Sequence, residues 1–219
     1  MILTVVGSTA STFSIGSKFE RSVQAVAASA GLSLLFLGVY GGCLWVTAQR
    51  SDIGLFYFIW ERSIPFVPFM IVPYLSIDLF FIFAPFVFRT AADLKLFTLR
   101  VATAIVIAGI CFLVLPLRFA FPRPQTDGWL GLAFDWFRGI DAPYNLFPSL
   151  HAALLALLVD AYGRNLRGFA LVSVMIWFAL IALSPILTHQ HHVVDILGGF
   201  ALAAACLATR FSKLCPMPN

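Results

Sequence analysis

Hydrophobic residues occur along this chain in long runs, broken by short connections that carry charges, prolines or glycines. There are six such runs, at about 27–48, 66–88, 97–117, 147–162, 168–187 and 193–211. Runs of this length fit helices that cross a bilayer, which need about 20 apolar residues each. The fourth and sixth runs are short, so their polar first turns would have to lie in a wet, protein-lined pocket rather than in lipid. The pattern predicts an all-α integral membrane protein with six transmembrane helices.

Composition supports this prediction. The chain has 219 residues, of which 61% are hydrophobic and 11% are charged, and its mean hydropathy is +0.95. Soluble domains carry about 25% charged residues, so a soluble domain, a disordered chain and a collagen-like chain are all excluded. The four cysteines show no CxxC spacing, which argues against a disulfide framework and a thiolate metal site. We expect a lead-in at 1–25 and one membrane domain at 26–215.

The formal charge of +4 is spread along the chain, without the clusters of basic and aromatic residues that would indicate a nucleic-acid partner. With six spans, nine of the 14 basic residues fall on the side of the two termini and five on the other. A basic excess marks the cytoplasmic side of membrane proteins. Both termini are therefore expected in the cytoplasm, and the loops 49–65, 118–146 and 188–192 are expected to face outward.

Three polar stretches stand out at the outer ends of the predicted spans. They read RFAFPRP at 118–124, FPSLH at 147–151 and THQHHVVD at 188–195. In the predicted topology they lie at the same depth on the same side of the bilayer. Ionisable residues inside a membrane protein are costly and indicate a functional site by default. The three stretches are therefore expected to form one site.

The first two stretches carry groups that suit a phosphate. Pro148 fits the first position of a helix, whose free N–H groups would form an anion site. The hydroxyl of Ser149 and the guanidiniums of Arg123 and Arg118 would add hydrogen bonds and positive charge. The alternative is that the Pro-Ser pair only caps the helix and that the arginines contact lipid headgroups.

The third stretch supplies a candidate nucleophile. His191 and Asp195 are four residues apart, so they share a helix face. A carboxylate in this position orients an imidazole and stabilises the charge that it gains on attacking. His151 would then protonate the leaving oxygen. The alternative is an Asp–His pair that only holds two helices together.

Two further histidines allow a metal-site interpretation, because His189 and His192 flank His191. Imidazole is a common ligand of zinc and copper. Neighbouring residues on a helix do not face each other, however, so we expect no metal and no cofactor. His192 is expected to pack at the interface and His189 to line the pocket entrance.

The second span contains Asp78. A carboxylate without a partner would cost about 2.5–3.5 kcal/mol at the bilayer centre. Asp78 is expected to face the bundle interior, with an arginine or hydroxyl partner, in a supporting role. Glu61 and Arg62, in the first outer loop, are expected to cover the site. Gly198 and Gly199 are expected to allow close helix packing.

At these residues the chain resembles the type 2 phosphatidic acid phosphatase superfamily, whose motifs are written KxxxxxxRP, PSGH and SRxxxxxHxxxD. The first motif is represented by Arg123-Pro124, with Pro116 at the lysine position and Arg118 as the candidate substitute. The second reads PSLH at 148–151, with leucine in place of glycine. All three motifs follow in order over about 60–205.

The third motif begins at Ser184, has Pro185 in place of arginine, and keeps His191 and Asp195 at the family spacing. In lacking this arginine and in reading THQHHVVD, the third motif is similar to that of the inositol phosphorylceramide synthase and sphingomyelin synthase branches. Those enzymes transfer a phosphorylated headgroup between lipids. The chain is also similar to the membrane half of bacterial members that are fused to a dual-specificity phosphatase.

The resemblance implies a lipid phosphatase or phosphotransferase of a bacterial inner membrane, with its site facing the periplasm or the exterior. His191 would form a phosphohistidine, Asp195 would orient it and His151 would be the general acid, without a metal. Arg123, Arg118 and Ser149 would bind the phosphate. A transporter and an inactive membrane scaffold are the non-enzyme alternatives. The sequence leaves the lipid, the choice between hydrolysis and transfer, and the oligomeric state open.

Overall fold

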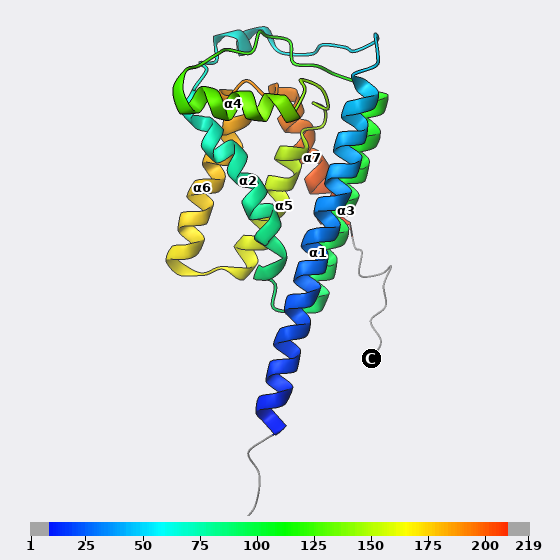
Figure 1. Ribbon diagram of the computed structural model, residues 1–219, viewed down its shortest axis with the longest axis vertical. Coiled ribbons are helices and arrows are strands. Elements are labelled where there is room, and N and C mark those ends of the chain that lie inside the picture. Colours follow the sequence, from blue (N-terminus) through cyan, green and yellow to red (C-terminus); the bar gives the residue numbers. More distant parts are fainter. Residues whose placement is uncertain (1–8, 210–219) are drawn as a thin grey trace, which may run out of the picture.

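The computed structural model describes residues 9–209, with side chains from residue 18 onward, and the described chain is helical without a strand. The α-helices are α1 (Thr9–Thr47), α2 (Ile71–Phe83), α3 (Ala91–Val114), α4 (Gly128–Ile140), α5 (Leu150–Asn165), α6 (Gly168–Leu187) and α7 (Val193–Ala208). Three short 3₁₀ helices accompany them: η1 (Ile59–Ser63) in the first long loop, and η2 (Pro68–Met70) and η3 (Ala84–Val87) at the two ends of α2. Figure 1 shows the arrangement.

Four helical stretches in the described part are long and apolar enough to cross a membrane: Lys18–Thr47, Pro68–Val87, Ala91–Val114 and Gly168–Leu187. Large apolar side chains on these helices point outward, among them Leu37, Ile110 and Ile176. This is the arrangement of a protein whose surroundings are lipid, and it supports the predicted membrane protein. α5 and α7 have 16 residues each, about 24 Å of helix, which is shorter than the hydrocarbon core. Six spans therefore stay a prediction.

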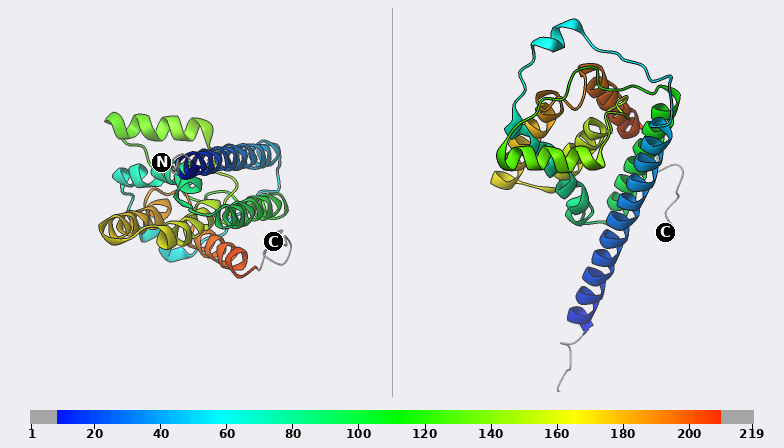
Figure 2. Two further views of the ribbon diagram at one scale, coloured as in Figure 1. Left: turned by 90° about the horizontal axis from the view of Figure 1, so that it is seen from below. Right: turned by 45° about the horizontal axis from the view of Figure 1, so that its top comes forward.

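The shorter helix α5 is the centre of the bundle. It contacts α2, α3, α6 and α7, and most of its side chains are buried, including Leu154, Leu157 and Leu158. α1 lies along α3 on one side of the bundle, as both views of Figure 2 show. A Cβ at Gly109 of α3 would lie 2.4 Å from Cγ1 of Val39, so glycine is needed for this close approach.

The connections sort to the two ends of the bundle. Segments 48–67, 115–149 and 188–192 lie together at one end, here called the loop end, and the turns at 88–90 and 166–167 lie at the other, the turn end (Figure 1). Backbone hydrogen bonds join the long segments: the N–H of Gly54 donates to the Pro116 carbonyl over 2.9 Å, and that of Val67 donates to Leu187 over 2.8 Å. The three predicted outer loops are therefore at one end of the molecule.

One helix was not predicted. The range 118–146 was expected as a loop, but residues Gly128–Ile140 form α4, which lies across the loop end (Figures 1 and 2). Its inner face buries Phe134 and Phe137 against Ile71 and Tyr74. Its outer face exposes four large apolar side chains at helical spacing: Trp129, Leu132, Trp136 and Ile140. α4 is therefore an amphipathic helix whose apolar face is partly buried against α2 and partly exposed.

The predicted lead-in at 1–25 is helical from Thr9 onward, as the first turns of α1. Residues 1–8 lie outside the described part of the chain. So do Arg210 and Lys213, two of the residues on which the predicted sidedness depends.

Candidate active site

His191 and Asp195 lie together at the loop end, where α7 begins. Nδ1 of His191 is 3.6 Å from Oδ2 of Asp195, and both side chains are buried. The same oxygen accepts the backbone N–H of His192 over 2.8 Å, which caps α7. At this distance Nδ1 of His191 faces the carboxylate but makes no hydrogen bond among the described residues. The predicted orienter and nucleophile are therefore neighbours.

The turn before α7 is fixed by the end of α6. The Pro185 carbonyl accepts the N–H groups of Gln190, over 2.8 Å, and His191, over 3.1 Å. The hydroxyl of Thr188 donates to the Ser184 carbonyl over 2.6 Å. Pro185, which stands where the family motif has arginine, thus contributes through its backbone, because its carbonyl holds the turn that carries His191.

Ser149 connects the second stretch to the third. Its backbone N–H donates to the Asp195 carbonyl over 2.9 Å, and its hydroxyl accepts the Ala152 N–H over 3.2 Å as the N-cap of α5. The expectation that Pro148 takes the first helical position is wrong, since the helix begins at Leu150 after the serine cap. A serine hydroxyl satisfies a free N–H of the first turn, which favours it as the cap.

Gly199 allows α5 and α7 to meet at this point. A Cβ there would lie 2.3 Å from the Ser149 carbonyl oxygen and 2.8 Å from Cβ of Ala152. The predicted packing role of Gly199 is therefore confirmed. Gly198 has a similar role, because its Cβ would lie 2.4 Å from the ring of Phe147.

His151 lies on the first turn of α5, facing α2 and α6. Its ring is stacked on Tyr74, with 4.6 Å between centroids and 12° between planes, and its Nε2 lies 3.4 Å from the Ile181 carbonyl. His151 and His191 are close enough to interact electrostatically. The two histidines predicted as general acid and nucleophile therefore lie within electrostatic range of each other, at the same end of the bundle.

Asp141, directly after α4, is a site residue that the sequence did not predict. Its Oδ1 accepts the Tyr40 hydroxyl over 2.7 Å, and its carbonyl accepts a hydrogen bond from Arg123 over 3.3 Å. Burial raises the pKa of Asp141, while the Tyr40 hydrogen bond and the charges of Arg123 and His191 act in the opposite direction. A partly buried carboxyl group thus lies within electrostatic reach of the candidate nucleophile.

Arg138, on the last turn of α4, is a second missed residue. It donates to the Pro124 carbonyl over 2.7 Å, and its guanidinium lies 4.9 Å from the ring centroid of Phe134. Burial lowers the pKa of both Arg123 and Arg138, and the charge of Arg123 lowers the pKa of Arg138 further. The Nε atoms of both arginines are buried without a hydrogen-bond partner in the described part. Two guanidiniums with free donors therefore lie near each other.

His192 has a structural role. Its Nδ1 lies 2.8 Å from Oε2 of Glu61, and its Nε2 accepts the Ala120 N–H over 3.1 Å. Its ring is stacked on Phe119 at 4.5 Å. Both ring nitrogens are occupied, so His192 is not free to bind a substrate or a metal. Its predicted packing at an interface is confirmed.

Glu61 was expected to cover the site, and instead it anchors η1 to the start of α7. Its carboxylate accepts the Phe58 N–H over 2.9 Å and the Val193 N–H over 3.3 Å, in addition to its contact with His192. The side chain is 3% exposed. A buried carboxylate at the N-terminus of a helix interacts favourably with the helix dipole.

His189 lies beside the site. Its Nε2 is 3.2 Å from the Ile64 carbonyl, its ring contacts Phe66 and Phe119, and burial lowers its pKa. Its Nδ1 is buried without a partner among the described residues. Over residues 9–209, no group of three or more histidine, cysteine or acidic side chains is arranged to hold a metal ion.

Two predicted residues are not brought into this group. Arg118 is exposed, and only its backbone N–H is bonded, to the Gly54 carbonyl over 3.1 Å. Asp78 is exposed on α2, so the expectation that it faces the bundle interior is wrong. The buried face of α2 passes through Tyr74 and Ile77, and the next position along the helix turns outward.

The missed residues had weak sequence signals. Tyr40 and Tyr74 lie inside apolar runs, where an aromatic residue indicates only a core or lipid contact. Asp141 and Arg138 stand in a segment that was predicted as a loop, shortly before the PSLH motif. Recognising the helical spacing of WLGLAFDWF in that segment would have placed both at a helix end beside the site.

No family model matches the chain, and neither a curated protein nor a solved structure matches it. The likeness to the type 2 phosphatidic acid phosphatase superfamily therefore rests on the three motifs and stays a prediction.

Proposed function

We propose that this chain is a membrane enzyme that moves a phosphoryl or phosphorylated headgroup from a lipid to water or to a second lipid, through a phosphohistidine at His191. The observation that carries the proposal is one connected group at the loop end. His191 faces Asp195, and the Asp195 carbonyl accepts the N–H of Ser149, two residues before His151. The proposed nucleophile lies in the turn before α7, its orienter is on α7, and the proposed general acid is on α5, which packs against α7.

The proposed reaction has two steps. Nε2 of His191 attacks phosphorus and the bond to the leaving oxygen breaks, while His151 gives that oxygen a proton. Because Nε2–H of His151 faces the Ile181 carbonyl, Nδ1 holds the proton that is transferred. His151 therefore enters this step as an imidazolium, whose charge the bound phosphate would stabilise, and leaves it as a neutral imidazole. Water or a lipid hydroxyl then attacks phosphorus, the P–N bond breaks and the proton returns to His151. Asp195 stabilises the imidazolium that forms on His191.

The phosphate oxygens would be held by groups from three segments. Arg123 and Arg138 bring guanidiniums whose Nε atoms have no partner in the described part. The backbone N–H groups at the first turn of α5 add donors at the positive end of a helix dipole. Donors fixed in advance around a developing charge contribute several kcal/mol to catalysis. Arg138 would supply the positive charge that the family motifs take from their lysine and second arginine.

A lipid substrate is favoured by the position of the group. It lies at the ends of apolar helices, beside α4, whose outer face carries Trp129 and Trp136. Tryptophan and amphipathic helices are typical of the membrane interface. We place six spans in the bilayer, with the loop end outward as the basic residues indicate, and the termini in the cytoplasm of a bacterial cell.

Headgroup transfer between two lipids is the second candidate, and Pro185 favours it. A phosphate monoester carries more negative charge than a diester, so it needs more cations around it. The proline removes one of the family's cations from the third motif. Hydrolysis and transfer share the same first step and differ only in the acceptor.

The experiment is an assay on purified full-length protein with radiolabelled phosphatidic acid, and with phospholipids labelled at the headgroup phosphate. Each donor is tested with and without an acceptor lipid such as diacylglycerol or ceramide, and both free phosphate and new lipid are measured. We expect His191→Ala to abolish turnover and His189→Gln to retain it. Activity of the His191→Ala protein equal to that of the parent would overturn the proposal.

A further inference from the structure

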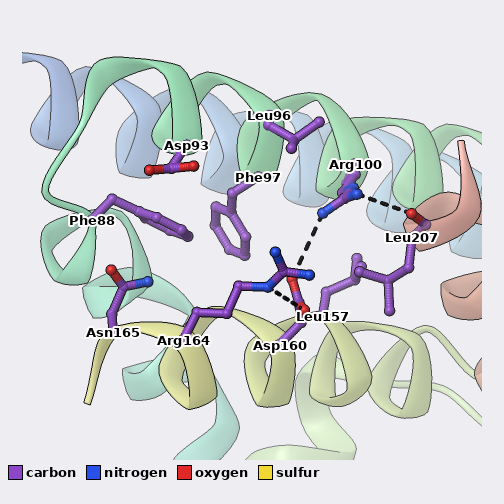
Figure 3. Close-up of a pocket in the computed structure, with 10 residues that line it drawn as sticks. All are labelled: Phe88, Asp93, Leu96, Phe97, Arg100, Leu157, Asp160, Arg164, Asn165 and Leu207. Atoms are coloured by element: carbon purple, nitrogen blue, oxygen red, sulfur yellow. Dashed lines mark hydrogen bonds and ion pairs between the residues drawn. The ribbon is translucent and has the colours of Figure 1, made fainter. Parts of the chain in front are cut away.

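A pocket of about 160 Å³ lies at the turn end, between α3, α5 and α7 (Figure 3). Arg100, Asp160 and Arg164 form its polar wall, and Phe97 and Leu157 are among its apolar lining. These residues lie near the ends of α5 and α7 that are opposite to Ser149 and Asp195. The pocket is therefore separate from the candidate active site.

One carboxylate lies between the two guanidiniums, which reach toward it from opposite walls in Figure 3. Nε of Arg164 donates to Oδ1 of Asp160 over 2.6 Å, and a terminal nitrogen of Arg100 lies 3.7 Å from Oδ2. The other terminal nitrogen of Arg100 donates to the Leu207 carbonyl over 2.9 Å. Asp160 therefore engages only part of each guanidinium fork.

The remaining donors have few protein acceptors. The Arg100 side chain is 13% exposed, and its buried Nε has no hydrogen bond in the described part. Asp93, the second carboxylate of the lining, is bound by the hydroxyl of Thr90 at the start of α3. An anion with several oxygens would satisfy the free donors, and a guanidinium fork fits a phosphate.

The surroundings favour a lipid as the source of that anion. The pocket opens among helices whose outer faces are apolar, at the end that bears the basic excess. Basic pockets between membrane helices on the cytoplasmic side bind the headgroups of anionic phospholipids. We propose that this pocket binds the phosphate of an anionic phospholipid, between Arg100 and Arg164, while the acyl chains stay in the bilayer. The inference does not depend on the phosphohistidine reaction.

The test is a titration of full-length protein in detergent with dioctanoyl-phosphatidylglycerol, dioctanoyl-phosphatidylcholine and inorganic phosphate, with Kd measured by thermophoresis. Arg164 is 68% exposed, so Arg164→Gln is expected to fold. It should raise the Kd for phosphatidylglycerol roughly tenfold, as expected for the loss of a charge-assisted contact. Arg167→Gln is the matched control, since that arginine follows three residues later and does not line the pocket. It should leave Kd unchanged.

Two further variants separate a binding site from a structural clamp. Asp160→Asn removes the carboxylate that competes for both guanidiniums, so it should keep or lower the Kd. Arg123→Gln, at the loop end, should bind phosphatidylglycerol as the parent does, which distinguishes this pocket from the candidate active site. Equal effects of Arg164→Gln and Arg167→Gln would overturn the proposal, as would loss of binding in folded Asp160→Asn. Inorganic phosphate that competes as well as the lipid would contradict a lipid site.

Discussion

The carboxylate of Glu61 lies 2.8 Å from Nδ1 of His192, which is closer than the 3.6 Å between Asp195 and Nδ1 of His191. Two adjacent histidines therefore each face a carboxylate, but their other ring nitrogens differ. Nε2 of His192 accepts a backbone N–H, whereas Nε2 of His191 has no hydrogen bond to any residue that the structure describes. His192 therefore holds the loop end together, and Nε2 of His191 is available for the proposed attack on phosphorus.

The Glu61 contact predicts a stability effect. Glu61→Ala leaves the Phe58 and Val193 N–H groups and Nδ1 of His192 without an acceptor, so it should lower the free energy of unfolding by about 2–3 kcal/mol. Glu20→Ala, at an exposed position of α1, should have no measurable effect. Thermal unfolding in detergent measures both, and a Glu61→Ala protein that melts with the parent would contradict the structural role.

Asp141 predicts a pH dependence. Burial raises its pKa above the ordinary 3.8, so folding favours the protonated form. Its contribution to stability is present below the ordinary pKa and is lost as the pH rises through the raised one. Asp141→Asn keeps an oxygen for the Tyr40 hydroxyl and should remove this part of the pH dependence. Unfolding midpoints across that acidic range measure it, and identical profiles for parent and variant would refute the assignment.

Arg138 and Arg118 make opposite predictions about phosphate binding. The sequence offers Arg118 as the substitute for the motif's lysine, but the structure brings Arg138 beside Arg123 and leaves Arg118 exposed. Arg138→Gln should raise KM roughly tenfold, as expected for one hydrogen bond to a charged group, and Arg118→Gln should change KM less than twofold. Steady-state kinetics decides between them, with the lipid that the assay under Proposed function identifies as substrate. A larger increase in KM for Arg118→Gln than for Arg138→Gln would restore Arg118 as the phosphate ligand.

Gly199 predicts that helix spacing controls the site. A methyl group there would contact the Ser149 carbonyl, so Gly199→Ala should cost about 1–3 kcal/mol of stability by overpacking. It should also lower kcat, because it separates α7 from α5. Gly38→Ala is the matched control, since nothing lies within 4 Å of a Cβ at that position. Equal stability and activity in both variants would show that the close approach is not needed.

The hydropathy pattern predicted the helices well where lipid or core contacts set their ends. The run at 66–88 corresponds to Pro68–Val87. The run at 97–117 begins later than α3, which Thr90 caps by accepting the Asp93 N–H over 3.1 Å. The first turns of α3 carry charged residues, so the hydropathy pattern does not include them. α4 was missed because glycine, aspartate and arginine interrupt its apolar stripe.

The site was predictable where chemistry is local in sequence. The four-residue spacing of His191 and Asp195 predicted their proximity, and the structure places them together. The expectation that they share a helix face is wrong, because α7 begins at Val193 and His191 lies in the turn before it. The bond between Tyr40 and Asp141 joins residues 101 positions apart, and no periodicity links such a pair. Asp78 was placed wrongly because the free-energy cost of a charge inside a membrane does not determine which face of the helix carries it.

The most direct test of the central claim is to trap the covalent intermediate. Full-length protein is incubated briefly with lipid labelled at its phosphate and denatured in alkali, and label on the chain is measured before and after acid treatment. A P–N bond survives alkali and breaks in acid. The account predicts acid-labile label on the parent and on His189→Gln, and none on His191→Ala. Label that survives acid, or that persists in His191→Ala, would contradict it.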